Sequence, residues 1–101
     1  MNAHAPTAGV YLRFFVHKDR RHRDGELLHE WLLSEAKDLG LPGGTAFRAV
    51  AGFGRLRVTQ ETMRVDFVVT REAADQILER VRAEEDIQMF YAMSPAEFGT
   101  L

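Results

Sequence analysis

The chain has 101 residues, enough for one domain with a core of its own and too few for two. Its hydrophobic content of 46% is ordinary for a globular protein, and no apolar run approaches the roughly 20 residues of a membrane span. The net charge of −2 argues against a nucleic-acid partner, and the absence of cysteine excludes disulfides, thiolate metal sites and cysteine nucleophiles. We therefore expect a cytoplasmic protein that does not insert into membranes.

The first predicted element is a strand over residues 10–16. Its two faces alternate, with Val10, Leu12, Phe14 and Val16 on one side and Tyr11, Arg13 and Phe15 on the other. Because both faces carry aromatic side chains, we expect both to be covered. Residues 1–8 lack the basic segment and apolar core of a secretory signal, so we interpret them as a disordered tail before a domain at 9–101.

A helix is predicted after the polar run 17–24. Asp24 is the expected N-cap, because its carboxylate can accept hydrogen bonds from the free amides of the first turn. Apolar residues then recur at helical spacing: Leu28, Trp31, Leu32, Ala36 and Leu39. Gly40 stands where a left-handed residue ends a helix, and Pro42 prevents continuation.

Two further strands are predicted after this helix. The first spans residues 45–53 and closes at Gly52 and Gly54, glycines that suit a sharp turn or a close approach of the backbone. A short polar connection, residues 55–62, leads to an alternating strand over residues 63–69.

Thr70 is the expected N-cap of a second helix. Apolar residues recur along it at helical spacing: Ala74, Ile77, Leu78 and Val81. The acidic run 84–86 at its end opposes the helix dipole, and the sequence pattern gives no reason for it. Residues 87–93 form the expected last strand, which Pro95 ends because proline cannot extend a ladder. Phe98 in the following tail is expected to dock on a neighbouring surface.

The order β-α-β-β-α-β is that of the α+β ferredoxin-like sandwich, in which one antiparallel sheet carries two helices on one face. The other face of the sheet would carry aromatic and charged side chains: Tyr11, Phe15, Arg13, Arg64 and Asp66. Self-association would bury these aromatic rings and pair these charges, so we expect a closed homo-oligomer.

Arginine dominates the cations, with eleven of the thirteen, and Arg48, Arg55 and Arg57 flank the glycine turn. Forked guanidinium donors suit carboxylates and phosphates, and the backbone amides around Gly52 and Gly54 could hold phosphate oxygens. A small anionic ligand is one interpretation of this turn. A tight turn without any ligand is the other.

The sequence gives little support for a catalytic nucleophile or a metal site. Ser34 lies within the first predicted helix and Ser94 precedes a proline, and neither sits in a nucleophile elbow. His17, His22 and His29 match no compact metal-ligand spacing. The residues alone therefore indicate neither an enzyme nor a metal site.

Two segments resemble a known family. The run LLHEWLLSEAKDLGLPGGTAFRAVAGFG (residues 27–54) and the ending SPAEFG (residues 94–99) are similar to PII-like proteins. The resemblance is to a small bacterial branch of unknown function, related to the nitrogen-regulatory PII signalling proteins. The segment GFGR (residues 52–55) matches the place where PII proteins leave their second strand and enter a long loop.

The resemblance implies a non-enzymatic regulatory or sensor protein, a homotrimer with ligand clefts between subunits. An adenine nucleotide is the implied effector, no other cofactor is expected, and the implied partner is a membrane transporter or ion channel. The expected ligand-binding residues are Arg48, Gly52, Phe53, Gly54, Arg55 and Arg57. The chain departs from the PII pattern in two places: the connection 55–62 is short, and residues 82–88 are acidic where PII proteins have a phosphate-binding loop.

Two alternatives remain open. A small dimeric ferredoxin-like enzyme of the oxygenase or isomerase type would use a pocket lined by His17, Trp31 and phenylalanine side chains. A ligand-independent interaction module would assemble and dock on a membrane transporter. A trimer favours the regulatory protein, whereas a dimer with haem or flavin colour favours the enzyme.

Overall fold

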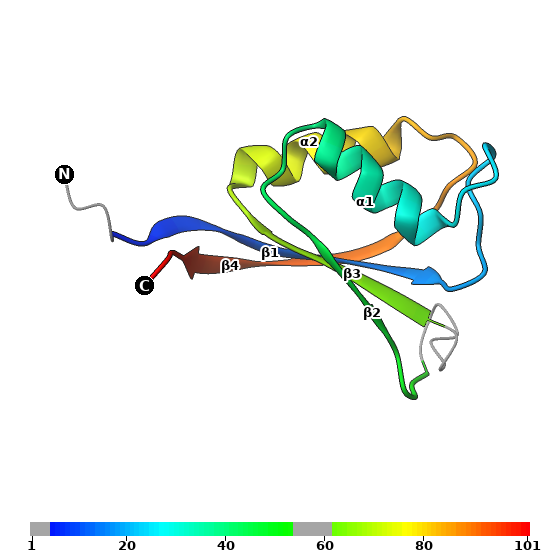
Figure 1. Cartoon of the computed structure of the whole chain (residues 1–101), viewed down its shortest axis with the longest axis horizontal. Coiled ribbons are helices and arrows are strands. Elements are labelled where there is room, and N and C mark those ends of the chain that lie inside the picture. The colour runs from blue at the N-terminus through cyan, green and yellow to red at the C-terminus, as the bar shows by residue number, and fades with distance from the viewer. Residues whose placement is uncertain (1–4, 54–61) are drawn as a thin grey trace.

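The computed structural model describes residues 5–53 and 62–101, which form one four-stranded sheet and two helices (Figure 1). The elements are β1 (Thr7–His17), α1 (Leu28–Asp38), β2 (Thr45–Arg48), β3 (Thr62–Val69), α2 (Arg71–Arg82) and β4 (Phe90–Phe98). The strand order is β2-β3-β1-β4, all neighbours are antiparallel, and both helices lie on one face of the sheet. The predicted ferredoxin-like α+β sandwich is confirmed. Neither described helix is long and apolar enough to cross a membrane.

The core lies between the sheet and the two helices. Inward-facing residues of β1 and β3 lie opposite one another: Val10 and Val69, Leu12 and Phe67, Phe14 and Val65. The helices add the buried apolar residues that their spacing predicts: Leu28, Trp31, Leu32 and Ala36 from α1, and Ala74, Ile77, Leu78 and Val81 from α2. Each fully buried side chain of leucine or phenylalanine size contributes roughly 1.5–3 kcal/mol, so this layer is the main source of stability.

The C-terminal end of α1 is as predicted. Gly40 has a left-handed φ of 85° and donates its N–H to the Lys37 carbonyl at 3.0 Å, and Leu41 donates to the Ala36 carbonyl at 3.0 Å. These two bonds form a Schellman motif, which satisfies carbonyls that the helix leaves open. Leu39, expected on the buried stripe, is 38% exposed because the helix ends there.

The prediction that Asp24 caps the start of α1 is wrong. The helix begins at Leu28 without a side-chain cap, and its first N–H donates to the Arg20 carbonyl at 2.7 Å. Asp24 instead accepts the N–H of Glu26 at 2.8 Å, an Asx turn that shapes the loop before the helix. A carbonyl from the loop therefore replaces the expected side-chain cap.

Strand β2 is shorter than predicted, because its ladder ends at Arg48. The prediction that the strand reaches Phe53 and closes at the turn 52–54 is wrong. Val50 is 90% exposed and Phe53 is 96% exposed, so no core layer holds an extended strand beyond Arg48.

Strand β4 starts later and runs further than the predicted residues 87–93, since it covers Phe90–Phe98. Pro95 does not end it, because β4 is an edge strand that pairs with β1 alone. An edge strand needs only alternate amides for its single neighbour, so one residue without an N–H is tolerated there.

The far ends of β1 and β4 pair with each other. Thr7 lies opposite Phe98, so β1 begins inside the segment 1–8 that the sequence assigns to a tail. A Cβ on Gly9 would lie 2.6 Å from the Phe98 ring and 2.3 Å from the Val69 carbonyl oxygen. Glycine is therefore required at this position, and Phe98 docks within its own sheet.

Candidate functional site

The sheet face opposite the helices carries an aromatic and charged network. The Tyr11 hydroxyl donates to Asp66 Oδ2 at 2.7 Å, and Arg64 Nε donates to Asp66 Oδ1 at 2.9 Å. Arg13 lies over the Tyr11 ring at 4.4 Å, and Arg64 lies over the Phe47 ring at 4.7 Å. Four of the five residues predicted to share this face thus contact one another, and Phe47 of β2 adds an aromatic ring. The fifth, Phe15, lies against the Phe90 ring of β4.

The described part of the predicted ligand site lies at one end of the sheet, where β2 ends and β3 begins. We call it the hairpin end. Arg48 closes β2 there, is exposed, and pairs through its backbone with Met63 of β3. Gly52 and Phe53 follow the strand and are exposed. The other three predicted residues, Gly54, Arg55 and Arg57, lie outside the described residues.

A cavity of about 130 Å³ opens at the hairpin end. Side chains from β1, α1, β3 and the segments before α1 and β4 line it, including Phe15, His17, Arg20, Leu28, Thr62 and Gln88. Thr62 links this cavity to the predicted site, because its carbonyl accepts the N–H of Ala49, the residue after Arg48, at 2.8 Å. A residue of the cavity wall is therefore hydrogen-bonded to the residue that follows Arg48.

The loop before α1, residues 18–27, brings Arg20 to the cavity. The Arg20 carbonyl accepts the first N–H of α1 at 2.7 Å, and the Arg20 N–H donates to the His17 carbonyl at 3.1 Å. Its guanidinium Nη2 donates to the Asp86 carbonyl at 3.0 Å. These bonds connect the loop to α1, to β1 and to the segment between α2 and β4.

His22 anchors the same loop to the core. The residue is 8% exposed, and its ring stacks on Trp31 with 4.6 Å between centroids and 9° between planes. Its Nδ1 lies 3.2 Å from the Asp24 backbone nitrogen and 3.1 Å from Asp24 Oδ1, and its Nε2 lies 3.2 Å from Glu84 Oε2. That last pair has the distance of an ion pair but lacks the alignment of a hydrogen bond.

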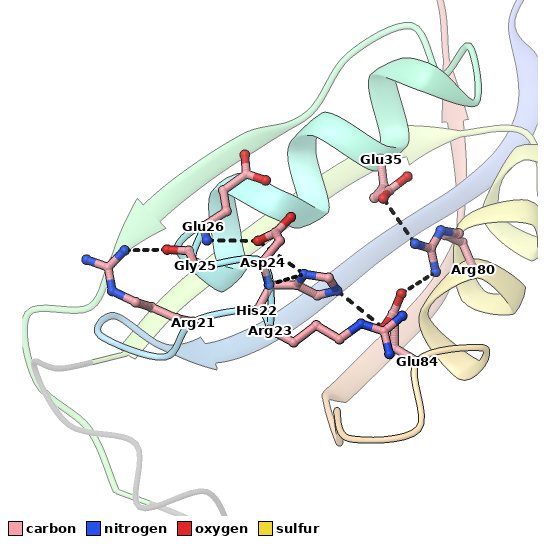
Figure 2. Close-up of polar contacts among 9 residues, drawn as sticks. All are labelled: Arg21, His22, Arg23, Asp24, Gly25, Glu26, Glu35, Arg80 and Glu84. Carbon is pink, nitrogen blue, oxygen red and sulfur yellow. Dashed lines mark hydrogen bonds and ion pairs between the residues drawn. The ribbon is translucent and has the colours of Figure 1, made fainter.

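Glu84 joins the loop to both helices in one ionic cluster (Figure 2). Its side chain is 6% exposed, and its carboxylate lies 2.8 Å from Arg80 Nη1 and 3.7 Å from Arg23 Nη2. Arg80 also donates to Glu35 of α1 at 3.1 Å. The hydrogen bond between Arg80 and Glu84 lowers the pKa of the carboxyl and raises the pKa of the guanidinium. This cluster gives Glu84, one of the three acidic residues after α2, a structural role. It also connects the loop that carries Arg20 to both helices.

Sequence reasoning names little of the cavity wall. It names His17 only as a metal or pocket candidate. Arg20 stands in a cation-rich stretch of the sequence, residues 18–23, that suits an anion, but it is not among the expected ligand-binding residues, and Gln88 has no predicted role. Arg20 and Asp86 are 66 residues apart, and no local pattern connects such positions. Arg80 and Glu84, by contrast, have the four-residue spacing that predicts an ion pair on a helix. Within residues 5–53 and 62–101, no three His, Asp or Glu side chains are grouped to hold a metal ion.

In fold, the chain is similar to PII-like proteins of known structure. A protein of Thermus thermophilus, assigned as a PII-like signalling protein, has a TM-score of 0.68 at 21% identity, covering 93% of this chain and 91% of that one. CPII, a nitrogen regulatory PII-like protein from Thiomonas intermedia K12 bound to ADP, AMP and bicarbonate, has a TM-score of 0.67 at 13% identity, covering 94% and 99%. The chain therefore has the PII-like form of the ferredoxin-like fold.

The family follows from the sequence match. Residues 9–94 match DUF190, described as "Uncharacterized ACR, COG1993". A UPF0166 protein from Aquifex aeolicus (strain VF5) is 34% identical over 79 residues, which are 78% of this chain and 71% of that relative. The chain belongs to the DUF190 family, and the resemblance to PII-like proteins found in the sequence is confirmed.

Proposed function

We propose that this chain is a non-enzymatic regulatory or sensor protein of the cytoplasm, a homotrimer that binds a small anion or an adenine nucleotide in clefts between subunits. The observation that supports the proposal is the hairpin end of a PII-like fold, where Arg20 lines a cavity and Arg48 is the last residue of strand β2. CPII, which shares the fold, binds ADP, AMP and bicarbonate. The anionic groups of such ligands suit the forked donors of arginine.

The sheet face opposite the helices supports self-association. Large apolar side chains remain partly exposed there, since Phe47 is 45%, Val68 38% and Phe90 39% exposed. The charges of Arg64 and Asp66 already neutralise each other, so burying this face would leave neither of them unpaired. Contact with further copies of the chain would remove these apolar surfaces from water.

The proposed ligand site includes Arg48, Gly52 and Phe53, and the sequence adds three members outside the described residues: Gly54, Arg55 and Arg57. Calorimetric titration with AMP, ADP, ATP and bicarbonate tests it. We expect binding to the wild type and about tenfold weaker binding to Arg48→Gln, because a charge-assisted hydrogen bond is lost.

The matched control is Arg71→Gln. Arg71 is exposed, pairs with Asp75 at 3.0 Å, and follows the end of β3 opposite the hairpin end, so this variant is expected to bind like the wild type. Light scattering on the same samples reports the number of subunits. A folded trimer that gives no heat with any of these ligands would refute the ligand claim.

A second candidate function, docking on a membrane transporter or ion channel without any ligand, is favoured by two residues after β2. Val50 is 90% exposed and Phe53 is 96% exposed, and a partner would bury such apolar side chains. Retention of a transporter by the wild type but not by Phe53→Ser, in buffer without nucleotide or bicarbonate, would favour this function. Retention that needs a ligand would favour the regulatory protein.

A further inference from the structure

His17 presents a hydrogen-bond donor at the cavity of the hairpin end. Its Nδ1 accepts the N–H of Asp19 at 3.1 Å. Because this nitrogen acts as an acceptor, the ring proton lies on Nε2, which is then a donor. His17 is the last residue of β1, is exposed, and lines the cavity.

Arg20 adds a positive charge to the same cavity. Its one described side-chain bond is to the Asp86 carbonyl, a neutral acceptor, and it takes no part in the ion pairs found within residues 5–53 and 62–101. A guanidinium has five N–H donors, so most of those on Arg20 remain for a ligand. The backbone bonds of the loop and the Asp86 contact hold this charge in place.

The size and surroundings of the cavity limit the ligand. Its volume of about 130 Å³ is less than half of the roughly 300 Å³ at which sites for larger organic ligands begin. The turn whose Asp86 carbonyl Arg20 contacts carries two acidic residues besides the ion-paired Glu84, namely Glu85 and Asp86. Like charges repel, so this turn disfavours a ligand with several negative charges.

We propose, building on the function proposed above, that this cavity selects a small oxyanion with one negative charge, the chemistry that bicarbonate and short carboxylates share. His17 Nε2–H and the Arg20 guanidinium donate to its oxygens, with Thr62 and Gln88 as further polar wall residues. The apolar side of the cavity, formed by Phe15 and Leu28, reduces the water that competes for these donors.

The single tryptophan of the chain provides the test. Trp31 stacks on His22 within the loop that carries Arg20, so its fluorescence reports on this loop. Wild-type protein is titrated with bicarbonate, acetate, inorganic phosphate and ATP at constant ionic strength. We expect saturable changes with bicarbonate and acetate at lower concentrations than with phosphate or ATP.

Two variants and one control locate the response. Arg20→Gln, which loses the positive charge, and His17→Ala, which loses the ring donor, are each expected to weaken bicarbonate binding about tenfold. Arg21→Gln is the control, because Arg21 donates to the Gly25 carbonyl and does not line the cavity. Circular dichroism confirms that each variant is folded, and His17→Ala, at an exposed strand end, provides the test should Arg20→Gln fail to fold.

The results distinguish the assignment of this cavity from the regulatory function proposed above. Equal bicarbonate affinity in the wild type and both folded variants would overturn the assignment of this cavity. Binding of ATP with no binding of bicarbonate or acetate would overturn it as well, while the proposed regulatory function would stand. A folded oligomer that binds none of these ligands would contradict both.

Discussion

Replacing Gly44 by alanine is expected to destabilise the protein, whereas the same change at the adjacent Gly43 is not. A Cβ at Gly44 would lie 2.5 and 2.8 Å from two ring atoms of Phe67 and 3.0 Å from a methyl carbon of Leu33. Phe67 is 1% exposed in the core, so its ring cannot move aside freely. Overpacking of this kind costs about 1–3 kcal/mol, and for a domain of this size it lowers the melting temperature by roughly 4–24 °C.

At Gly43 nothing lies within 4 Å of the added carbon. Gly43→Ala is therefore expected to be neutral or to stabilise the protein by about 0.4–1 kcal/mol, because alanine restricts the unfolded chain. Urea unfolding followed by circular dichroism measures both variants, at one protein concentration since an oligomer's stability depends on it. Free energies of unfolding within about 0.5 kcal/mol of each other would refute the packing argument around the Phe67 ring.

Two more predictions concern the helix that ends at the ionic cluster. Thr70→Ala removes the hydroxyl that accepts the N–H of Ala73 at 3.2 Å, and we expect it to lower the free energy of unfolding in urea by about 1 kcal/mol. Thr70→Ser keeps the cap, so equal decreases in the two variants would contradict this role of the hydroxyl. The folded-state pKa of Glu84 lies below its ordinary value of 4.5, mainly through the hydrogen bond from Arg80, so its stabilisation is present above pH 4.5 and is lost as the pH falls through the folded value. Stability measured against pH is therefore expected to fall less on acidification in Glu84→Gln than in the wild type or in Glu85→Gln, and parallel curves for the three proteins would contradict the expectation.

Local patterns predicted the elements that depend on local physics. The alternation of β1, the stripe of α2 with its Thr70 cap, and the left-handed Gly40 each follow from neighbouring residues and are found in the structure. The order of elements then led to the fold, because few topologies accommodate β-α-β-β-α-β.

The predictions that were wrong, at Pro95 and Asp24, depend on contacts that the sequence does not display. Pro95 continues β4 only because that strand lies at the edge of the sheet, which is a property of the whole topology. Asp24 looks like a cap but accepts a bond within its own loop, because the Arg20 carbonyl already receives the first amide of α1. Local propensity could not rank these competing bonds.

The candidate site also contains residues that local sequence predicts and residues that only the fold brings together. Arg48 could be chosen from its place beside the glycine turn. Arg20 and Gln88, however, meet only after the loop before α1 and the segment before β4 fold toward the end of β1. The buried pairing of Glu84 with His22 is likewise visible only in three dimensions.

Native mass spectrometry tests the central claim most directly, because one spectrum reports both the number of subunits and the ligands they carry. Spectra of the wild type are recorded alone and with AMP, ADP, ATP and bicarbonate. We predict an assembly of three chains of 11.5 kDa each that gains up to three copies of at least one of these ligands. A monomer or dimer that gains none of them would contradict this prediction.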